Sequence, residues 1–277
     1  MVNEPLSLTV VVPTLNVKRT IRTTLESLAP LRDAGASIII VDSFSDDGTL
    51  EAAAGLYDQL LTTPRGSMYA AINAGIAAAS TEWVAYLNAD DIVFSDILLK
   101  ELGKIEATTD LIYGDVDFID FTGRFLHSYS FPGPKEIVPL ATSYICAISP
   151  IGTFFRKTLW EKLKGFDTTY RYSADFDFLL RVAISGAQMK KISGPTVGAF
   201  RLHGKQLSQN EGQPGLNENY KIIDRMNLKV SRFRKVFSLL KFKIGNFWEL
   251  LIRALRHRRL TGSGFSECIT PPTYQKD

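Results

Sequence analysis

Short runs of apolar, β-branched residues alternate with helix-like stretches through the first half of the chain. Strands are predicted at 8–12, 37–41 and 83–87, and helices at 17–28, after Gly48, at 67–79 and at 95–107. Such alternation is typical of βαβ units, in which helices cover both faces of a largely parallel sheet. The pattern therefore predicts an α/β fold with a mixed, mostly parallel sheet.

The second half of the chain has a less regular pattern. Residues 111–131 are strand-like with an interruption at Thr122-Gly123, which predicts a β-hairpin. Helices are expected at 157–164 and 174–186, and a late strand at 196–202. From 205 to 215 the composition becomes polar and glycine-containing, as in loops and domain boundaries. We therefore predict a first domain at 1–210 and a C-terminal helical extension and tail at 211–277.

Polar side chains follow three of the predicted strands, at the point where each strand ends. They are Pro13, Thr14 and Asn16 after the first strand, Asp42 at the second, and Asn88, Asp90 and Asp91 after the third. In parallel sheets, ligands bind beyond the carboxyl ends of the strands. Two adjacent carboxylates repel by roughly 3 kcal/mol at about 5 Å with an effective dielectric near 20. A divalent cation would offset that repulsion at Asp90 and Asp91.

Composition narrows the class of protein. With 277 residues and 45% hydrophobic content, the chain can bury a large core. Cys146 and Cys268 lie far apart with no disulfide or metal spacing, which fits a reducing, cytoplasmic setting. The chain contains no run of about 18 uncharged apolar residues, so the sequence predicts no membrane-spanning helix. The first 13 residues lack a basic start and a cleavage site, so we expect a first strand there and not a signal peptide.

Six motifs occur in a characteristic order along residues 6–208. They are PTLN (13–16), VDSFSDDGT (41–49), MYAAINAGIAAAS (68–80), LNADD (87–91), GFDTTYRYSADFDFLLR (165–181) and FRLHGKQLS (200–208). Each motif alone is weak, whereas the ordered set resembles family 2 glycosyltransferases. The resemblance implies the GT-A fold, a Rossmann-like nucleotide-diphospho-sugar transferase architecture, for the domain at 1–210.

The resemblance also implies roles for individual residues. Asp42 would face the base of a nucleotide-diphospho-sugar donor, Asp90 would contact ribose and metal, and Asp91 would bind the metal. The cation would be Mg²⁺ or Mn²⁺, which neutralises a diphosphate leaving group. His203 would be a further metal or diphosphate ligand, although a surface-loop histidine is the alternative. Further donor-binding positions are Pro13, Thr14, Asn16, Arg65, Asn73, Asn88 and Arg201, and helix capping or solvent exposure explains Arg65 and Asn73 almost as well.

Asp175 matches the general base of the family, which would take the proton of the attacking acceptor hydroxyl. The alternative is that Asp175 only caps the following helix. Inversion at the sugar carbon is likewise implied by the resemblance alone. The chain departs from many relatives, which have an aspartate in place of Ala70, and from some that have His-Gln near Pro150-Ile151. These differences leave the identity of the donor sugar open.

The C-terminal region carries a basic, amphipathic pattern. Between Lys229 and Arg259 there are ten Lys or Arg residues against one acid. The apolar residues step by three or four, as on one helix face, at Phe233, Phe237, Leu240, Ile244, Phe247, Leu251 and Leu255. This pattern favours an interfacial helix on an anionic membrane. Packing on the first domain or on a second subunit, as in a homo-oligomer, is the alternative, and nucleic-acid binding is a poorer account because no recognition fold accompanies the charge.

The sequence therefore predicts a metal-dependent, inverting glycosyltransferase that acts on a glycan or a polyprenyl-linked acceptor. A place in surface polysaccharide biosynthesis, peripheral on the cytoplasmic face of the membrane, fits this reading. A catalytically silent nucleotide-sugar-binding or scaffold protein is one alternative. The other is a sugar-1-phosphate nucleotidyltransferase, which usually begins with a glycine-rich loop, and PTLNVKRT (13–20) has no glycine.

Overall fold

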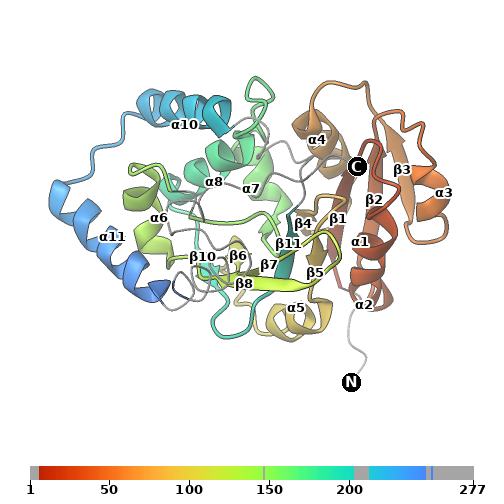
Figure 1. Ribbon diagram of the computed structural model, residues 1–277, viewed down its shortest axis with the longest axis horizontal. Coiled ribbons are helices and arrows are strands. Elements are labelled where there is room, and N and C mark those ends of the chain that lie inside the picture. The colour runs from red at the N-terminus through yellow and green to blue at the C-terminus, as the bar shows by residue number, and fades with distance from the viewer. Residues whose placement is uncertain (1–5, 146, 203–211, 248–250, 252–277) are drawn as a thin grey trace, which may run out of the picture.

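The computed structural model describes residues 6–145, 147–202, 212–247 and 251 (Figure 1). The strands are β1 (Leu8–Thr14), β2 (Ser37–Asp42), β3 (Gln59–Thr62), β4 (Trp83–Tyr86), β5 (Ile92–Val93), β6 (Leu111–Tyr113), β7 (Val116–Ile119), β8 (Phe125–Tyr129), β9 (Phe154–Arg156), β10 (Met189–Lys191) and β11 (Gly198–Arg201). The helices are α1 (Ile21–Ser27), α2 (Ala29–Asp33), α3 (Thr49–Ala53), α4 (Met68–Ala78), α5 (Ser95–Leu102), α6 (Pro134–Ala141), α7 (Lys157–Lys162), α8 (Ala174–Ile184), α10 (Gly212–Met226) and α11 (Arg232–Gly245).

A seven-stranded sheet in the order β10-β6-β9-β4-β1-β2-β3 forms the centre of the fold. The strands β4, β1, β2 and β3 run parallel to one another, whereas β9 is antiparallel to both β4 and β6. Strand order proceeds outward from β1 to β3 and then reverses to β4 on the other side of β1. The predicted mixed, mostly parallel sheet is confirmed.

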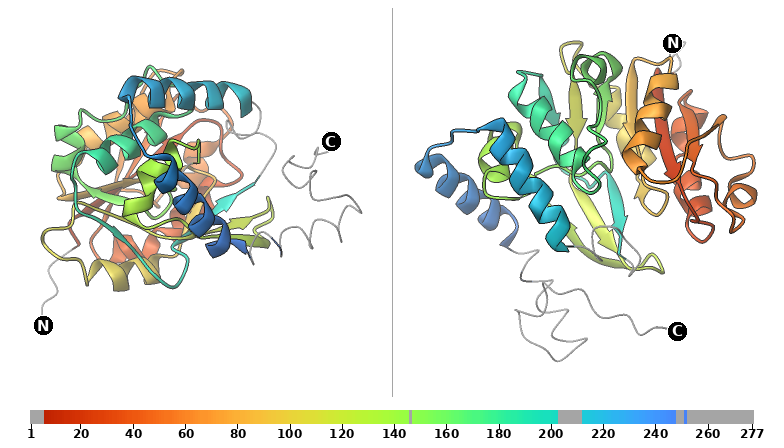
Figure 2. Two further views of the ribbon diagram at one scale, coloured as in Figure 1. Left: turned by 90° about the vertical axis from the view of Figure 1, so that its left-hand side faces the viewer. Right: turned by 90° about the horizontal axis from the view of Figure 1, so that it is seen from above.

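This reversal places helices on both faces of the sheet. Right-handed crossovers put α1 and α3 on one face and α4, which returns from β3 to β4, on the other. The two helices α1 and α3 contact each other, and α4 contacts β1, β2 and β4 (Figure 2). The carboxyl ends of β2, β1 and β4 are therefore neighbours at one edge of the sheet, at the switch in strand order where α/β folds bind ligands.

Close packing of α4 on the sheet depends on a glycine. A Cβ atom at Gly75 would lie 2.4 Å from Val11 Cγ1, so any larger residue would push the helix off β1. The side chain of Tyr69, in the first turn of α4, is buried with the sheet residues Val11 and Val41 in one hydrophobic core. The alanine-rich motif at 68–80 thus fixes the position of the helix that follows β3.

A second, four-stranded sheet in the order β5-β11-β7-β8 covers the segment after β4. Strand β11 pairs with β5 just past Asp91, and β7 and β8 form the predicted hairpin, with Gly123 at a φ of 90°. The predicted strand at 111–120 is divided, because β6 belongs to the large sheet and β7 to the small one. The sequence did not predict the elements α2, β3, β5, α6, β9 and β10.

Two helices follow the first domain, α10 and α11. The predicted boundary at 210 falls in 203–211, outside the described residues, and α10 already begins at Gly212, where a loop was expected. Helix α11 contacts α6, so part of the predicted extension packs on the first domain (Figure 1). Among the described residues, no helix combines the length and the apolar character needed to cross a membrane.

Candidate active site

The edge formed by β1 and β2 holds Asp42. The strands are in register with Thr14 opposite Asp42, and both side chains are almost fully buried. The Thr14 hydroxyl donates to Asp42 Oδ1 at 3.0 Å, while the Ser45 hydroxyl donates to Oδ1 at 2.6 Å and the Ser45 N–H to Oδ2 at 2.8 Å. A carboxylate accepts about four hydrogen bonds, so these three leave one acceptor position on Oδ2. Pro13 lies within β1 and is buried beside Val41.

The loops after β1 and β2 are joined by reciprocal polar contacts. Asn16, at a φ of 55°, donates from Nδ2 to Asp46 Oδ1 at 3.0 Å and accepts from the Asp46 N–H at 2.9 Å. Arg65 donates to the carbonyls of Ser43 and Phe44 and to Asp46. The hydrogen bond from Arg65, with that from Asn16, lowers the pKa of Asp46. Asn16 and Arg65 therefore shape the loops that follow β1 and β2.

The turn between β2 and α3 is held by side chains of the motif VDSFSDDGT. Asp47 accepts from the N–H and the hydroxyl of Thr49, whereas Ser45 and Asp46 bond to Asp42 and to Asn16. Gly48 has a left-handed conformation, with a φ of 88°. Ser45 and Asp46 therefore belong to the candidate site and do not cap the helix.

The acidic motif after β4 is held by the second sheet. Asp91 is 1% exposed and accepts from the Arg201 N–H at 2.9 Å and from Asn88 Nδ2 at 3.3 Å. The Arg201 guanidinium donates to the carbonyls of Asp90 and Phe121. Burial raises the pKa of Asp91, and the adjacent charge of Asp90 raises it further. Arg201 therefore holds the backbone of the acidic motif in place, where a donor contact was predicted.

These residues fit an oxygen-liganded divalent cation. Within the described residues, Asn88 Oδ1 is buried and has no hydrogen-bond partner, beside two adjacent carboxylates. A cation would satisfy that oxygen and relieve the repulsion between Asp90 and Asp91. No group of three or more His, Cys, Asp or Glu side chains suited to a metal occurs in the described part of the chain. His203, the further predicted ligand, lies outside that part.

Asp175 opens helix α8, and its side chain is half-buried. Its Oδ1 accepts from the Phe176 N–H at 2.8 Å and lies 3.0 Å from the hydroxyl of Tyr69, at the start of α4. Tyr69 thus ties Asp175 to the helix that begins at the same sheet edge as Asp42 and Asp91. Burial raises the pKa of Asp175, and the two hydrogen bonds offset only part of that rise. The carboxylate is therefore more basic than an ordinary aspartate.

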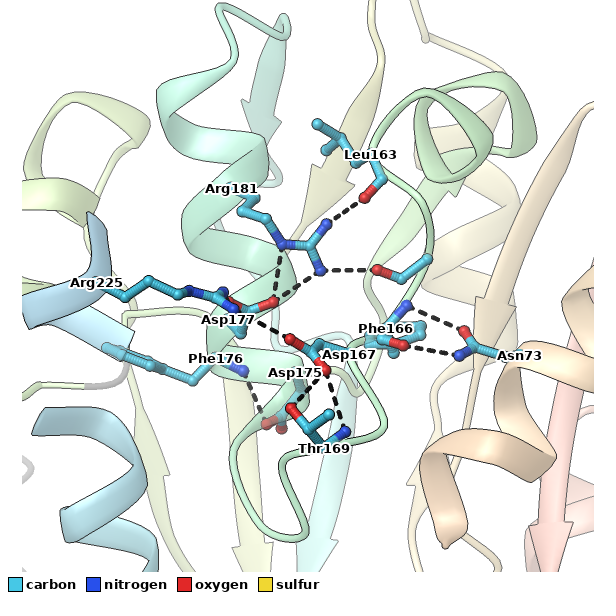
Figure 3. A network of polar contacts seen from close by, with 11 residues as sticks. Asn73, Leu163, Phe166, Asp167, Thr169, Asp175, Phe176, Asp177, Arg181 and Arg225 are labelled. Carbon is cyan, nitrogen blue, oxygen red and sulfur yellow. Dashed lines mark hydrogen bonds and ion pairs between the residues drawn. The ribbon is translucent and has the colours of Figure 1, made fainter. Parts of the chain in front are cut away.

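Asp177, two residues on, has a different environment. It is fully buried and forms ion pairs with Arg181 on its own helix and with Arg225 on α10 (Figure 3). Arg225 also pairs with Asp167 at 3.1 Å. Asp175 and Asp177 thus have different surroundings, and Asp177 joins α8 to α10.

Asn73 of α4 fixes the segment that leads to α8. Its Nδ2 donates to the Phe166 carbonyl at 2.8 Å, and its Oδ1 accepts from the Phe166 N–H at 3.0 Å (Figure 3). Both polar groups of the amide therefore bind this chain, where a donor contact was predicted. Ala70, where many relatives have an aspartate, lies in the first turn of α4 next to Tyr69.

Sequence reasoning did not find Tyr69, Glu218 or Arg225. Tyr69 lies inside a motif recognised for its alanines, and the other two lie on α10, beyond the matched region. No local pattern distinguishes a surface glutamate from one that accepts backbone N–H groups of a distant loop.

Comparison with known proteins agrees with this geometry. Residues 9–174 match the glycosyl transferase family 2 profile. The chain is 28% identical to a PGL/p-HBAD biosynthesis glycosyltransferase of Mycobacterium bovis, over 70% of this chain and 77% of the relative.

Two solved structures share the fold. Residues 1–349 of S. aureus TarS, in complex with UDP, match with a TM-score of 0.60 at 18% identity, over 94% of this chain and 76% of that fragment. The mannosyltransferase PcManGT of Pyrobaculum calidifontis, in complex with GDP-Man and Mn²⁺, matches with a TM-score of 0.60 at 18% identity, over 94% of this chain and 77% of PcManGT. The chain belongs to glycosyl transferase family 2 and is a glycosyltransferase with the GT-A fold.

Proposed function

We propose that this enzyme transfers a sugar from a nucleotide-diphosphate donor to an acceptor hydroxyl with inversion, and that Asp175 is the general base. The observation that carries the proposal is the position of Asp175. Its half-buried carboxyl group is tied by Tyr69 to the sheet edge that holds Asp42 and Asp91, and its pKa is raised. A base of this kind takes the acceptor proton as the acceptor oxygen bonds to the anomeric carbon and the bond to the diphosphate breaks.

The donor would occupy the edge formed by β2, β1 and β4. Asp42 has one acceptor position left on Oδ2, which suits a base or ribose donor group. Thr14, Asn16 and Arg65 would act by shaping the surrounding loops, since their hydrogen bonds are with groups of this chain. Asn88 and Asp90 complete the proposed donor site. Pro13, Asn73 and Arg201 would support it from behind, since their contacts are with this chain.

Asp90 and Asp91 would hold Mg²⁺ or Mn²⁺, with Asn88 Oδ1 as an uncharged ligand and His203 as a further one. The ion would neutralise charge on the diphosphate leaving group. Two solved relatives in fold carry Mn²⁺ with a nucleotide or nucleotide sugar, PcManGT and the glucosyl-3-phosphoglycerate synthase of Mycobacterium tuberculosis. Asn88 and the two aspartates support the same chemistry here.

The acceptor would be a glycan or a lipid-linked molecule, as in surface polysaccharide biosynthesis. The mycobacterial relatives named for PGL/p-HBAD biosynthesis support this reading. The C-terminal helix supports it too, because two opposite faces of α11 have different surroundings. Ser238 and Asn246 are buried, and Leu239 and Phe242 pack against the core. Asn246 exchanges two hydrogen bonds of 3.0 Å with the backbone of Ser130, which fixes α11 on the first domain.

The other face of α11 is apolar and exposed. It carries the predicted stripe, with exposed fractions of 79% for Phe233, 57% for Phe237, 54% for Leu240, 72% for Ile244 and 54% for Phe247. At 100° per residue, Arg232 and Lys243 fall on one flank of this stripe and Arg234 and Lys241 on the other. An apolar face bordered by cations on both flanks matches an anionic bilayer surface. We propose this surface as the partner of α11, peripheral on the cytoplasmic face of the membrane.

The packed face of α11 bears on the predicted C-terminal extension and tail at 211–277. One face of α11 packs on the first domain, as in the packing alternative. The proposed membrane contact therefore concerns the opposite face alone. A second copy covering the exposed face, as in a homo-oligomer, is the competing occupant that an experiment must separate from lipid.

Ligand-dependent melting temperature tests the proposed donor site. Ligands that prefer the native state raise the melting temperature. UDP, UDP-GlcNAc and GDP-mannose, each with and without Mn²⁺, are the first probes, because fold relatives bind them. A metal-dependent shift with one nucleotide, reduced in Asp91→Asn, supports the site. If no nucleotide diphosphate binds with Mg²⁺ or Mn²⁺, both this proposal and the silent-binder alternative are wrong.

A further inference from the structure

A glutamate from α10 binds the backbone just before the proposed base. Glu218 Oε1 accepts from the Arg171 N–H, and Oε2 accepts from the N–H groups of Tyr172 and Ser173, each at 2.9 Å. Successive N–H groups of this kind form an anion-binding concavity. Ser173 is the N-cap residue of α8, but its side chain makes no capping bond and donates to Gly215 of α10. A carboxylate from another helix therefore holds the segment that enters α8.

The clamped segment is linked directly to Asp175. The carbonyl of Tyr172 lies 3.1 Å from the hydroxyl of Tyr69, and that hydroxyl lies 3.0 Å from Asp175 Oδ1. Glu218 thus binds the N–H groups of residues 171–173, while a carbonyl of the same segment, that of Tyr172, contacts Tyr69, the partner of Asp175. Any shift of 171–173 would move both the start of α8 and the Tyr69 contact.

The charge of Glu218 also acts on the base. Tyr69 approaches Asp175 from α4 and Glu218 from α10. Around Asp177, two residues further along α8, two arginines (181 and 225) face two aspartates (167 and 177), so that network is nearly neutral. The negative charge of Glu218 raises the pKa of Asp175, whereas the hydrogen bond from Tyr69 lowers it. Glu218 therefore contributes a charge that opposes ionisation of Asp175, and Tyr69 does the reverse.

We propose that Glu218 is a positioning residue of the transfer reaction, which holds Asp175 in place through residues 171–173. This inference rests on the proposed function, because it takes Asp175 as the base. It adds α10, which lies outside the part of the chain matched by the family profile, to the catalytic machinery.

Two substitutions distinguish the positioning effect of Glu218 on residues 171–173 from the effect of its negative charge. Glu218→Gln keeps the length of the side chain but removes the charge and replaces one acceptor by a donor. Glu218→Asp keeps the charge but shortens the reach to 171–173. Asp224→Asn is the matched control, since it removes one negative charge from an exposed position of the same helix. The assay is release of UDP from UDP-GlcNAc, or of GDP from GDP-mannose, by transfer of the sugar to water, with Mn²⁺ across a pH series.

We expect the turnover of Glu218→Gln to fall between about ten- and a hundredfold, the scale of a small misplacement of a reacting group. The acid limb of its turnover–pH profile should move to lower pH, because a charge that opposes ionisation of Asp175 is lost. Glu218→Asp should lose turnover with the acid limb near its wild-type position, and Asp224→Asn should match the wild type. Equal acid limbs in the wild type and Glu218→Gln would overturn the charge role.

Amide hydrogen exchange supplies a readout that needs no activity. In Glu218→Gln, the amides of residues 171–173 should exchange faster, while those of the β1 and β2 core should not change. Unchanged exchange at 171–173 would overturn the clamp. If Asp175→Asn turns over donor like the wild type, the proposed base is wrong, and a faster exchange at 171–173 in Glu218→Gln would then show a clamp without a catalytic role.

Discussion

The exposed face of α11 gives a prediction whose size can be worked from the structure. Full burial of a large apolar side chain contributes about 1.5–3 kcal/mol. The five stripe residues are on average about three-fifths exposed, so insertion of the face would contribute on the order of 6 kcal/mol. Each nearby cation adds about 1 kcal/mol on an anionic surface.

The perturbation is Phe237→Glu with Ile244→Glu, two positions that are 57% and 72% exposed. Scaled by those exposed fractions, the lost burial is about 2.5 kcal/mol. That is roughly a 70-fold weaker partition, before charge repulsion is added. Folding should be nearly unaffected, because neither side chain faces α6. Lys221→Glu on α10 makes the same change in net charge at an exposed position away from this face, and it controls for charge alone.

The assay is flotation with vesicles of phosphatidylcholine, with and without phosphatidylglycerol. The wild type and Lys221→Glu should float with anionic vesicles, and the double variant should stay in the dense fraction. Equal flotation of the double variant and the wild type would refute the reasoning. So would a lipid-free dimer that the double substitution dissociates, because a second copy would then cover the face.

The pH dependence of turnover should reflect the raised pKa of Asp175, because this carboxyl group must be ionised to act as a base. Turnover should therefore fall as the pH drops through a value above about 3.9, the ordinary aspartate pKa. A pH profile whose acid limb lies at or below that value would contradict the assignment. Tyr69→Phe removes a hydrogen bond that lowers this pKa, so its acid limb should move to higher pH, opposite to Glu218→Gln; a shift to lower pH would count against the geometry. Gly75→Ala places a Cβ atom 2.4 Å from Val11 Cγ1 and should lower the unfolding free energy by about 1–3 kcal/mol in chemical denaturation, an effect absent from Gly245→Ala, whose Cβ would meet nothing within 4 Å. Asp177→Ala leaves Arg181 without its buried partner and should cost about 3–5 kcal/mol in the same assay; a loss below about 1 kcal/mol would show that the network does not join α8 to α10.

The sheet and its parallel order could be predicted because β1, β2 and β4 are apolar runs separated by periodic helices. The strands β3 and β9 were missed for different reasons. Residues 59–62 form an edge strand and are largely exposed, so no apolar run marks them. Strand β9 has only three residues and runs directly into α7. Its antiparallel insertion between β4 and β6 depends on contacts distant in sequence.

For the candidate site, the sequence predicted which edge of the sheet holds the polar residues but not the hydrogen-bond partners of their side chains. Strand-end position predicted that Asp42, Asn88 and Asp91 would lie together. The contacts of Asn73 with Phe166 and of Arg201 with Asp90 were not predictable, because an amide or a guanidinium bonds equally well to a ligand or to a remote backbone. The amphipathic stripe of α11 was predicted, and packing of the helix on the first domain was the alternative. The sequence did not show that the two occur on opposite faces, because the buried Ser238 and Asn246 interrupt the apolar pattern of the packed face.

The packing of α11 also affects how its function should be tested. Removal of 228–277 would expose the part of α6 that α11 covers and would delete the Asn246 contacts with Ser130. Point substitutions on the exposed face avoid that damage. They are therefore the sharper test of membrane contact.

The most direct test of the account is a comparison of donor binding and turnover in Asp175→Asn. Calorimetry should show that the variant binds UDP or GDP with Mn²⁺ as the wild type does, because Asp175 lies on α8 and outside the Asp90 and Asp91 motif. Nucleotide release from the matching donor should be abolished, because an amide cannot accept the proton of the attacking hydroxyl. Wild-type turnover in this variant would contradict the assignment of Asp175 as the base.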